Sequence, residues 1–139
     1  MNQSNTNIAA LLLRVTMGVM LIAHGLLKVM VFTLAGTAQF FEQVGFFAWM
    51  AYPVTFIEII GGALLIVGFY SRYVALLVIP VLLGALYVHI GNGWLFTAAN
   101  GGWEYPAFLV MTAIVVALLG DGEYSIRNVM IKKNQIANA

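Results

Sequence analysis

Residues Pro53 to Ile90 read PVTFIEIIGGALLIVGF, YSRY, VALLVIPVLLGALYVHI, and they contain the clearest indication of the fold. Two apolar segments, 53–69 and 74–90, are separated only by the turn YSRY at 70–73. A helix that spans the hydrocarbon core of a bilayer needs roughly 17–25 residues, and both segments are near that length. Because every backbone polar group in lipid needs an internal partner, we predict two helices joined as an antiparallel hairpin.

Two further apolar stretches flank this hairpin, at about 8–31 and 103–119. Hydrophobic residues make up 63% of the 139-residue chain and charged residues 8%, whereas soluble domains carry about 25% charged residues. We therefore predict an all-α membrane protein with a bundle of four transmembrane helices. Residues 1–126 form the transmembrane domain, and residues 127–139 form a polar cytoplasmic tail that is mobile beyond Arg127.

The first long connection, at 35–47, has the pattern of a short amphipathic helix. Its apolar side chains share one face, with Gln39, Glu42 and Gln43 opposite: Phe40, Phe41, Val44 and Phe47. Such helices are typical of the membrane–water interface, so we predict an interfacial helix on the outer leaflet. A loop packed over the bundle is the alternative.

Positive charge is shared unevenly between the two sides of the predicted bundle. The side with both termini and the 70–73 turn carries five cations, whereas the other side carries only Lys28: Arg14, Arg72, Arg127, Lys132 and Lys133. Cytoplasmic loops are enriched in lysine and arginine, so we predict that both termini are cytoplasmic. The net charge of +1 and the absence of cysteine exclude a nucleic-acid footprint, disulfides, thiolate metal sites and iron–sulfur clusters. A redox role would therefore need a bound organic cofactor or haem.

Ionisable side chains gather near one end of the predicted spans. His24 and Lys28 are four residues apart, so they share a helical face. Glu58 lies about 7–8 Å into the second span, at a depth that makes Lys28 its natural partner. His89 ends the third span. An ionisable residue inside a span is a candidate for a functional site, and these four residues indicate a polar pocket in the outer leaflet.

The other polar and small residues of the spans have structural interpretations. Arg14 either extends its charge to the lipid headgroups or pairs with Asp121 or Glu123. Gly61 and Gly62 follow Glu58 and allow a close approach of another helix.

A quinone head group matches the chemistry of this pocket, since it needs donors for its carbonyls, an apolar slot and a route for protons. We predict that Glu58 and His24 are catalytic and handle protons. We predict that five further residues bind the quinone: Lys28, His89, Trp103, Glu104 and Tyr105.

Three other interpretations of the cluster stay open. In the first, the side chains only pair with one another and hold the helices together. A haem between His24 and His89 is a second interpretation. The third is a metal site formed by both histidines and both glutamates: His24, Glu58, His89 and Glu104. We rank both below quinone, because only two histidines are present and the spacing is not diagnostic of a metal site.

Several short motifs occur in a fixed order along the chain. They are Arg14, HGLLK at 24–28, EIIGG at 58–62, Gly68 and Arg72 in the turn, His89, GGWEY at 101–105, and GDG at 120–122 followed by Ser125-Ile126. With these motifs the chain resembles the DoxX family of small four-helix bacterial membrane proteins, from about residue 11 to 126.

The resemblance implies a multi-pass protein of the bacterial cytoplasmic membrane and a link to redox chemistry, because the family is named for a subunit of a thiosulfate:quinone oxidoreductase. We therefore predict a redox-associated protein that binds quinone or a similar lipophile, and, if it is an enzyme, a quinone-linked oxidoreductase subunit. Its expected partners are the lipid bilayer and a membrane or periplasmic redox protein. One alternative is an accessory subunit that anchors a larger complex through Gly61, Gly62 and Gly84. Another is a small-solute transporter that works as a homo-oligomer.

Overall fold

The computed structural model describes residues 2–138, which contain only helices and connecting segments. Seven α-helices follow one another along the chain: α1 (Gln3–Met30), α2 (Leu34–Gln43), α3 (Ala51–Phe56), α4 (Gly62–Val67), α5 (Ser71–His89), α6 (Glu104–Leu119) and α7 (Ile126–Ala137). A π-helical turn, Ile57–Gly61, joins α3 to α4 without a break, and short 3₁₀ turns lie at Ala48–Met50 and Ile90–Asn92.

Three helical stretches are long and apolar enough to cross a membrane: Gln3–Met30, Ala48–Val67 and Ser71–Asn92. The fourth, α6, is an apolar helix of 16 residues and is therefore about 24 Å long. The predicted all-α bundle of four membrane helices is confirmed, with a short helix in the first connection.

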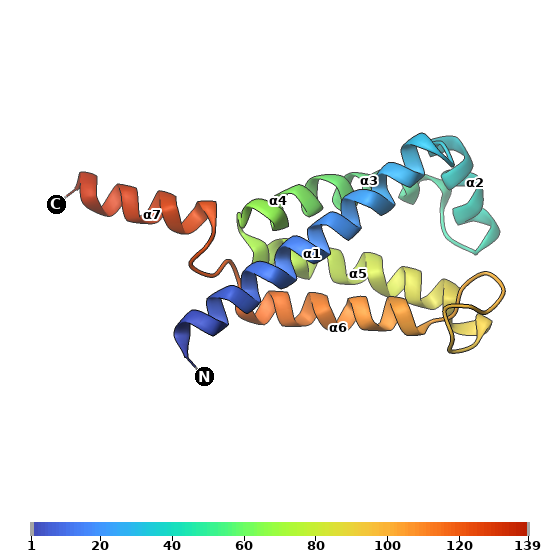
Figure 1. Ribbon diagram of the computed structural model, residues 1–139. Helices are drawn as coiled ribbons and strands as arrows, with labels where there is room; N and C mark the ends of the chain where they lie inside the picture. The colour runs from blue at the N-terminus through green and yellow to red at the C-terminus, as the bar shows by residue number, and fades with distance from the viewer. Residues whose placement is uncertain (1, 139) are drawn as a thin grey trace.

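The four long elements lie lengthwise beside one another (Figure 1). Both termini and the turn between α4 and α5 lie at one end of the bundle, which we call the terminal face. Helix α2 and the 90–103 loop lie at the opposite end, which we call the loop face. This arrangement places the ends of α1 and α5 and the beginning of α6 together at the loop face.

Helices α1 and α4 touch through their backbones. A Cβ added to Gly62 would lie 2.7 Å from the carbonyl oxygen of Gly18, and one added to Gly18 would lie 2.5 Å from that of Gly62. Gly61 faces Val74 of α5. Small residues at such crossings allow helices to pack closely in lipid.

The glycine-bearing surface that we predicted for a partner helix is therefore wrong. Gly61 and Gly62 are buried against α5 and α1 of the same chain, and Gly84 faces Phe46, whose Cζ would lie 3.8 Å from an added Cβ.

Arg14 is fully buried, with 0% of its surface exposed. It neither reaches the headgroups nor pairs with Asp121 or Glu123, so both predicted interpretations are wrong. Its guanidinium donates hydrogen bonds to three backbone carbonyls, those of Leu65 (2.7 Å), Ile66 (3.1 Å) and Tyr124 (2.5 Å). The last carbonyls of a helix lack intrahelical partners, and Arg14 supplies donors where α4 ends.

Asp121 ties three segments together at the terminal face. Its Oδ1 accepts the backbone N–H of Ser71 at 2.6 Å, and its Oδ2 accepts from Arg127 at 2.9 Å. Burial acts to raise the pKa of Asp121, but the hydrogen bonds from Ser71 and Arg127 and the positive charge of Arg127 outweigh it. The pKa of this carboxyl therefore lies below its ordinary value.

The C-terminal tail differs from the expectation of a mobile segment beyond Arg127. It forms α7, whose first turn is capped by the Ser125 hydroxyl, which accepts the N–H of Asn128 at 3.2 Å. Serine is a favoured N-cap residue because its oxygen satisfies one of the free donors at a helix start. Helix α7 extends away from the bundle (Figure 1).

Candidate functional site

The centre of the candidate site is an ion pair between α1 and the π-helical turn. The ammonium of Lys28 lies 2.8 Å from both carboxylate oxygens of Glu58, and the side chains are 19% and 8% exposed. Gly25 makes room for this contact, because an added Cβ would lie 3.2 Å from Cβ of Glu58. The pairing of Lys28 with Glu58 is as predicted.

The backbone around Glu58 is unusual, because residues 57–61 form a π-helix inside an otherwise α-helical span. A π-turn inserts one extra residue per turn and is found frequently at functional sites. Here it lies at the only acidic residue of the 51–67 span and directly opposite α1.

The ion pair lines a cavity of about 300 Å³, which we call the chamber. The polar side chains of the chamber are few and come from four helical elements, namely α1, the π-helical turn, α5 and α6: His24, Lys28, Glu58, His89 and Tyr105. The rest of its lining is largely apolar, with α5 contributing Leu82 and Val88 and α6 contributing Leu109. Cavities that bind small molecules have this mixture of an apolar wall and a few convergent polar groups.

Helix α2 and the residues after it cover the chamber at the loop face. Phe40, Phe41, Val44 and Phe46 all line the cavity. The predicted short helix is therefore present, but most of its apolar face points into the chamber. Phe47, which we placed on the same face, lies outside the cavity and stacks on Trp49.

Both histidines use Nδ1 on a backbone carbonyl. Nδ1 of His24 lies 2.9 Å from the carbonyl oxygen of Met20, and Nδ1 of His89 lies 3.0 Å from that of Gly101. A carbonyl oxygen can only accept, so Nδ1 carries the proton and donates in each ring. When the ring is neutral, Nε2 is an acceptor, and when the ring is protonated, Nε2 is a donor.

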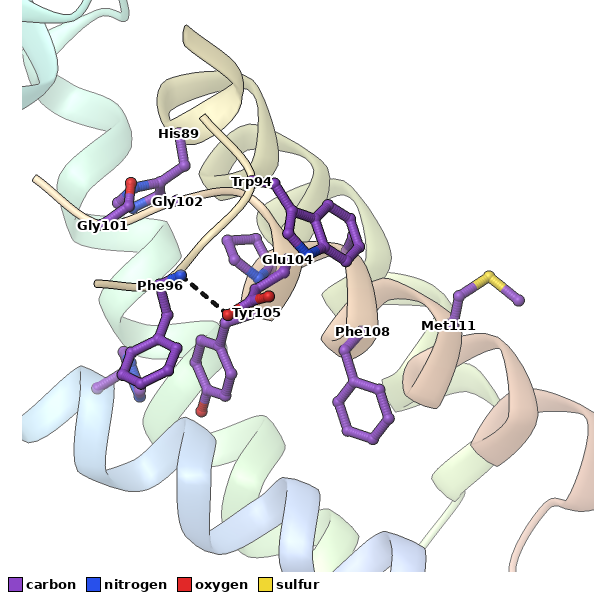
Figure 2. A pocket seen from close by; sticks show the side chains of 12 residues that line it. His89, Trp94, Phe96, Gly101, Gly102, Glu104, Tyr105, Phe108 and Met111 are labelled. Atoms are coloured by element: carbon purple, nitrogen blue, oxygen red, sulfur yellow. Dashed lines mark hydrogen bonds between the residues drawn. The ribbon is translucent and has the colours of Figure 1, made fainter. Parts of the chain in front are cut away.

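A second cavity of about 960 Å³, which we call the groove, opens beside the chamber at the start of α6 (Figure 2). His24, His89, Tyr105 and Pro106 line both cavities. The rings of His24 and Tyr105 are 6.4 Å apart between centroids and inclined by 27°. The two cavities are therefore adjacent and meet at these side chains.

Glu104 lines the groove but is held by the 90–103 loop. Its Oε1 accepts the backbone N–H of Phe96 at 2.9 Å, as the dashed line in Figure 2 shows. The backbone N–H of Glu104 donates to the carbonyl of Trp94 at 3.1 Å. Glu104 thus fixes the loop that closes one end of the groove.

The structure brings six of the seven predicted site residues around the two cavities: His24, Lys28, Glu58, His89, Glu104 and Tyr105. Trp103 lines neither cavity. Its ring packs edge-on against Trp94, with centroids 4.4 Å apart.

The interpretation of the cluster as a metal site finds no matching geometry. Among residues 2–138, no group of three or more histidine, aspartate or glutamate side chains is close enough to hold a metal ion. Glu58 is occupied by Lys28, and Glu104 by the backbone of Phe96.

Three parts of the site were not predicted from the sequence. The π-turn has no simple sequence signal, although the adjacent glycines of EIIGG mark an unusual backbone there. The cover over the chamber was found as a helix but placed against lipid. The groove depends on how the 90–103 loop folds back, which no local pattern specifies.

Comparisons with known proteins agree with this architecture. The profile of the DoxX family matches residues 9–91. A protein of Bacillus subtilis (strain 168) named "Putative oxidoreductase CatD" is 38% identical over 121 residues, which cover 87% of this chain and 85% of the relative. No solved structure matches the chain. The family match covers the region that forms α1 to α5, including Lys28, Glu58 and both histidines, and the chain belongs to the DoxX family.

Proposed function

We propose that this protein is a redox-associated membrane protein that binds a quinone, or a lipophilic carbonyl compound like it, in the chamber. The observation that carries the proposal is the Lys28–Glu58 ion pair in the wall of an otherwise apolar cavity. An ammonium has three N–H donors, and Glu58 accepts two of them. Within the part of the chain that the structure describes, the third N–H of Lys28 has no acceptor.

The chamber fits a quinone head group in size and in polarity. Its volume of about 300 Å³ is at the lower end of the range of about 300–1,000 Å³ for small-molecule sites. A carbonyl oxygen of the ligand would accept the free N–H of Lys28. The flat ring would lie among aromatic and aliphatic side chains such as Phe41 and Leu109.

His24 and Glu58 are suited to move protons at this position. Neutral His24 offers an unprotonated Nε2, which accepts a proton from a ligand hydroxyl, and the protonated ring donates one to a carbonyl. Glu58 accepts a proton when the charge of Lys28 is drawn toward the ligand. A bound quinone would supply the electron-accepting group, and these side chains would hold and transfer the accompanying protons.

The electrons would come from a partner, because the chain has no cysteine and no thiolate-based redox group. A relative that carries the name of an oxidoreductase supports the redox class. The uneven distribution of lysine and arginine supports a cytoplasmic terminal face, with the chamber in the opposite leaflet.

A binding experiment with menadione, a naphthoquinone without a tail, tests the proposal. Menadione is titrated against the purified protein and three variants, and the bound fraction is measured after separation of free ligand. Because the chain has no cysteine, thiol adducts do not form. We expect Glu58→Gln to weaken binding about 10- to 100-fold, as for loss of a charge-assisted hydrogen bond. Without Glu58 to hold it, Lys28 turns toward water and removes its donor from the chamber.

Two further variants separate loss of the site from loss of the fold. Lys28→Met combined with Glu58→Gln removes both charges, which preserves folding better than leaving one buried charge unpaired. This double variant should show the same loss of affinity for menadione as Glu58→Gln. Glu123→Gln removes a carboxylate that is also paired with a lysine, Lys132 at 3.1 Å, but at the terminal face, and should bind normally. Menadione affinity that is equal in all four proteins would refute the proposal.

A further inference from the structure

The groove, like the chamber, is lined mainly by apolar side chains. Along α6 it is lined by Ala107, Phe108 and Met111, and at the loop face it is bounded by Trp94 and Phe96 (Figure 2). Residues 104, 107, 108 and 111 follow the spacing of one face of a helix. The groove is therefore a mainly apolar channel that runs along α6 toward the middle of the bundle.

This channel is open on the side that faces lipid. The side chains of Phe108 and Met111 are 67% and 59% exposed, and α6 is one of the four membrane helices. Tyr105 and Phe108 project from α6 toward the side of α1 (Figure 2). In a bilayer these exposed side chains contact acyl chains, so a lipophile reaches the groove from the hydrocarbon core without passing through water.

The groove is also continuous with the chamber. His24 and Tyr105 line both cavities, and their rings flank the place where the two meet. A molecule with a polar ring near Lys28 therefore has one direction in which a long substituent leaves the chamber toward lipid. Helix α2 covers the chamber on the loop face, so the substituent does not leave that way.

We infer that the groove holds the hydrocarbon tail of the ligand, and that the natural ligand is a quinone with a prenyl or long alkyl chain, which enters between α1 and α6. This inference rests on the proposed function, because it assumes that the head group lies beside Lys28 and Glu58. It adds the ligand's class, its orientation and the residues that select for a tail.

Two probes with the same ring test the inference: menadione, which has no tail, and a menaquinone with four isoprene units. Both are titrated against the wild-type protein and against a variant with Phe108→Trp and Met111→Trp, in the same detergent. The larger rings fill the groove, and a misfit of even one methylene in an apolar pocket changes binding by about tenfold or more. We expect the variant to lose about tenfold in affinity for menaquinone and less than twofold for menadione.

Leu118→Trp is the matched control, because Leu118 is on the same helix, is 73% exposed and lies outside the groove. It should leave both affinities unchanged. Equal menaquinone affinity in the groove variant and the wild-type protein would overturn the inference, as would an equal loss for both probes. If menadione does not bind the wild-type protein at all, the proposed function itself fails. If menadione binds and only the tail-dependent effect is missing, the proposed function stands and this inference alone is wrong.

Discussion

Replacing Arg14 with methionine should weaken the fold strongly while leaving the site chemistry intact. The guanidinium is fully buried and donates to the carbonyls of Leu65, Ile66 and Tyr124. A hydrogen bond to a charged group contributes about 1.5–3 kcal/mol, and loss of a donor leaves buried carbonyls unpaired. The cost of burying the guanidinium offsets part of this contribution. We expect a net loss of about 3–5 kcal/mol, and methionine fills most of the vacated volume.

The purified protein is heated in mild detergent to a series of temperatures. At each temperature the fraction that still elutes as a folded, monodisperse species is measured, and the midpoint of its loss gives the Tm. A loss of 3–5 kcal/mol corresponds to a fall in Tm of about 10 °C or more for a chain of this size. Arg72→Met is the control, because Arg72 is exposed and donates two hydrogen bonds rather than three, to the carbonyls of Ala117 (3.0 Å) and Leu118 (3.3 Å). It should cost about 1 kcal/mol or less. An Arg14→Met protein as stable as Arg72→Met would refute the structural role of Arg14.

Two further predictions concern packing and pH. Gly62→Ala should lower the free energy of unfolding by about 1–3 kcal/mol, because the new Cβ would lie 2.7 Å from the Gly18 carbonyl oxygen. Gly91→Ala is the control and should lower it much less, because nothing lies within 4 Å of its added Cβ. Equal Tm values for the two variants would contradict the close crossing of α1 and α4. The pKa of Asp121 is lowered in the folded protein, so its ionised carboxylate stabilises the fold. This contribution is fully present at pH values above the unfolded pKa of about 3.9 and is lost as the pH falls through the folded pKa. The Tm of the wild-type protein should therefore fall more steeply than that of Asp121→Asn as the pH drops below about 4. Parallel pH profiles would show that the ionised Asp121 carboxylate does not stabilise the fold.

The parts of this fold that follow from local chemistry were predictable. Length and hydropathy define the four spans, because a bilayer imposes both a thickness and a penalty for unpaired backbone. The Lys28–Glu58 pair also follows from the sequence, since two opposite charges at similar depth in lipid lower each other's cost. These inferences need only the position of each residue along its own helix.

The predictions that were wrong concern contacts between segments distant in sequence. Arg14 bonds to carbonyls freed where α4 ends and to the segment before α7, and no spacing in the sequence reveals those acceptors. The apolar face of α2 is equally suited to lipid and to a cavity, so amphipathicity alone could not place it. Trp103 was assigned to the site because aromatic residues suit both ligand contacts and the membrane interface, but it packs on Trp94 instead.

The most direct test of the central claim is the quinone content of the protein as purified from native membranes in mild detergent, measured by solvent extraction and mass spectrometry. We expect close to one quinone per chain in the wild-type protein and in Glu123→Gln, and almost none in a folded Lys28→Met, Glu58→Gln protein. A folded wild-type protein that carries no quinone and does not bind added menaquinone would rule out a quinone site in the chamber. It would favour the accessory-subunit alternative, in which the Lys28–Glu58 pair only holds α1 against the π-turn.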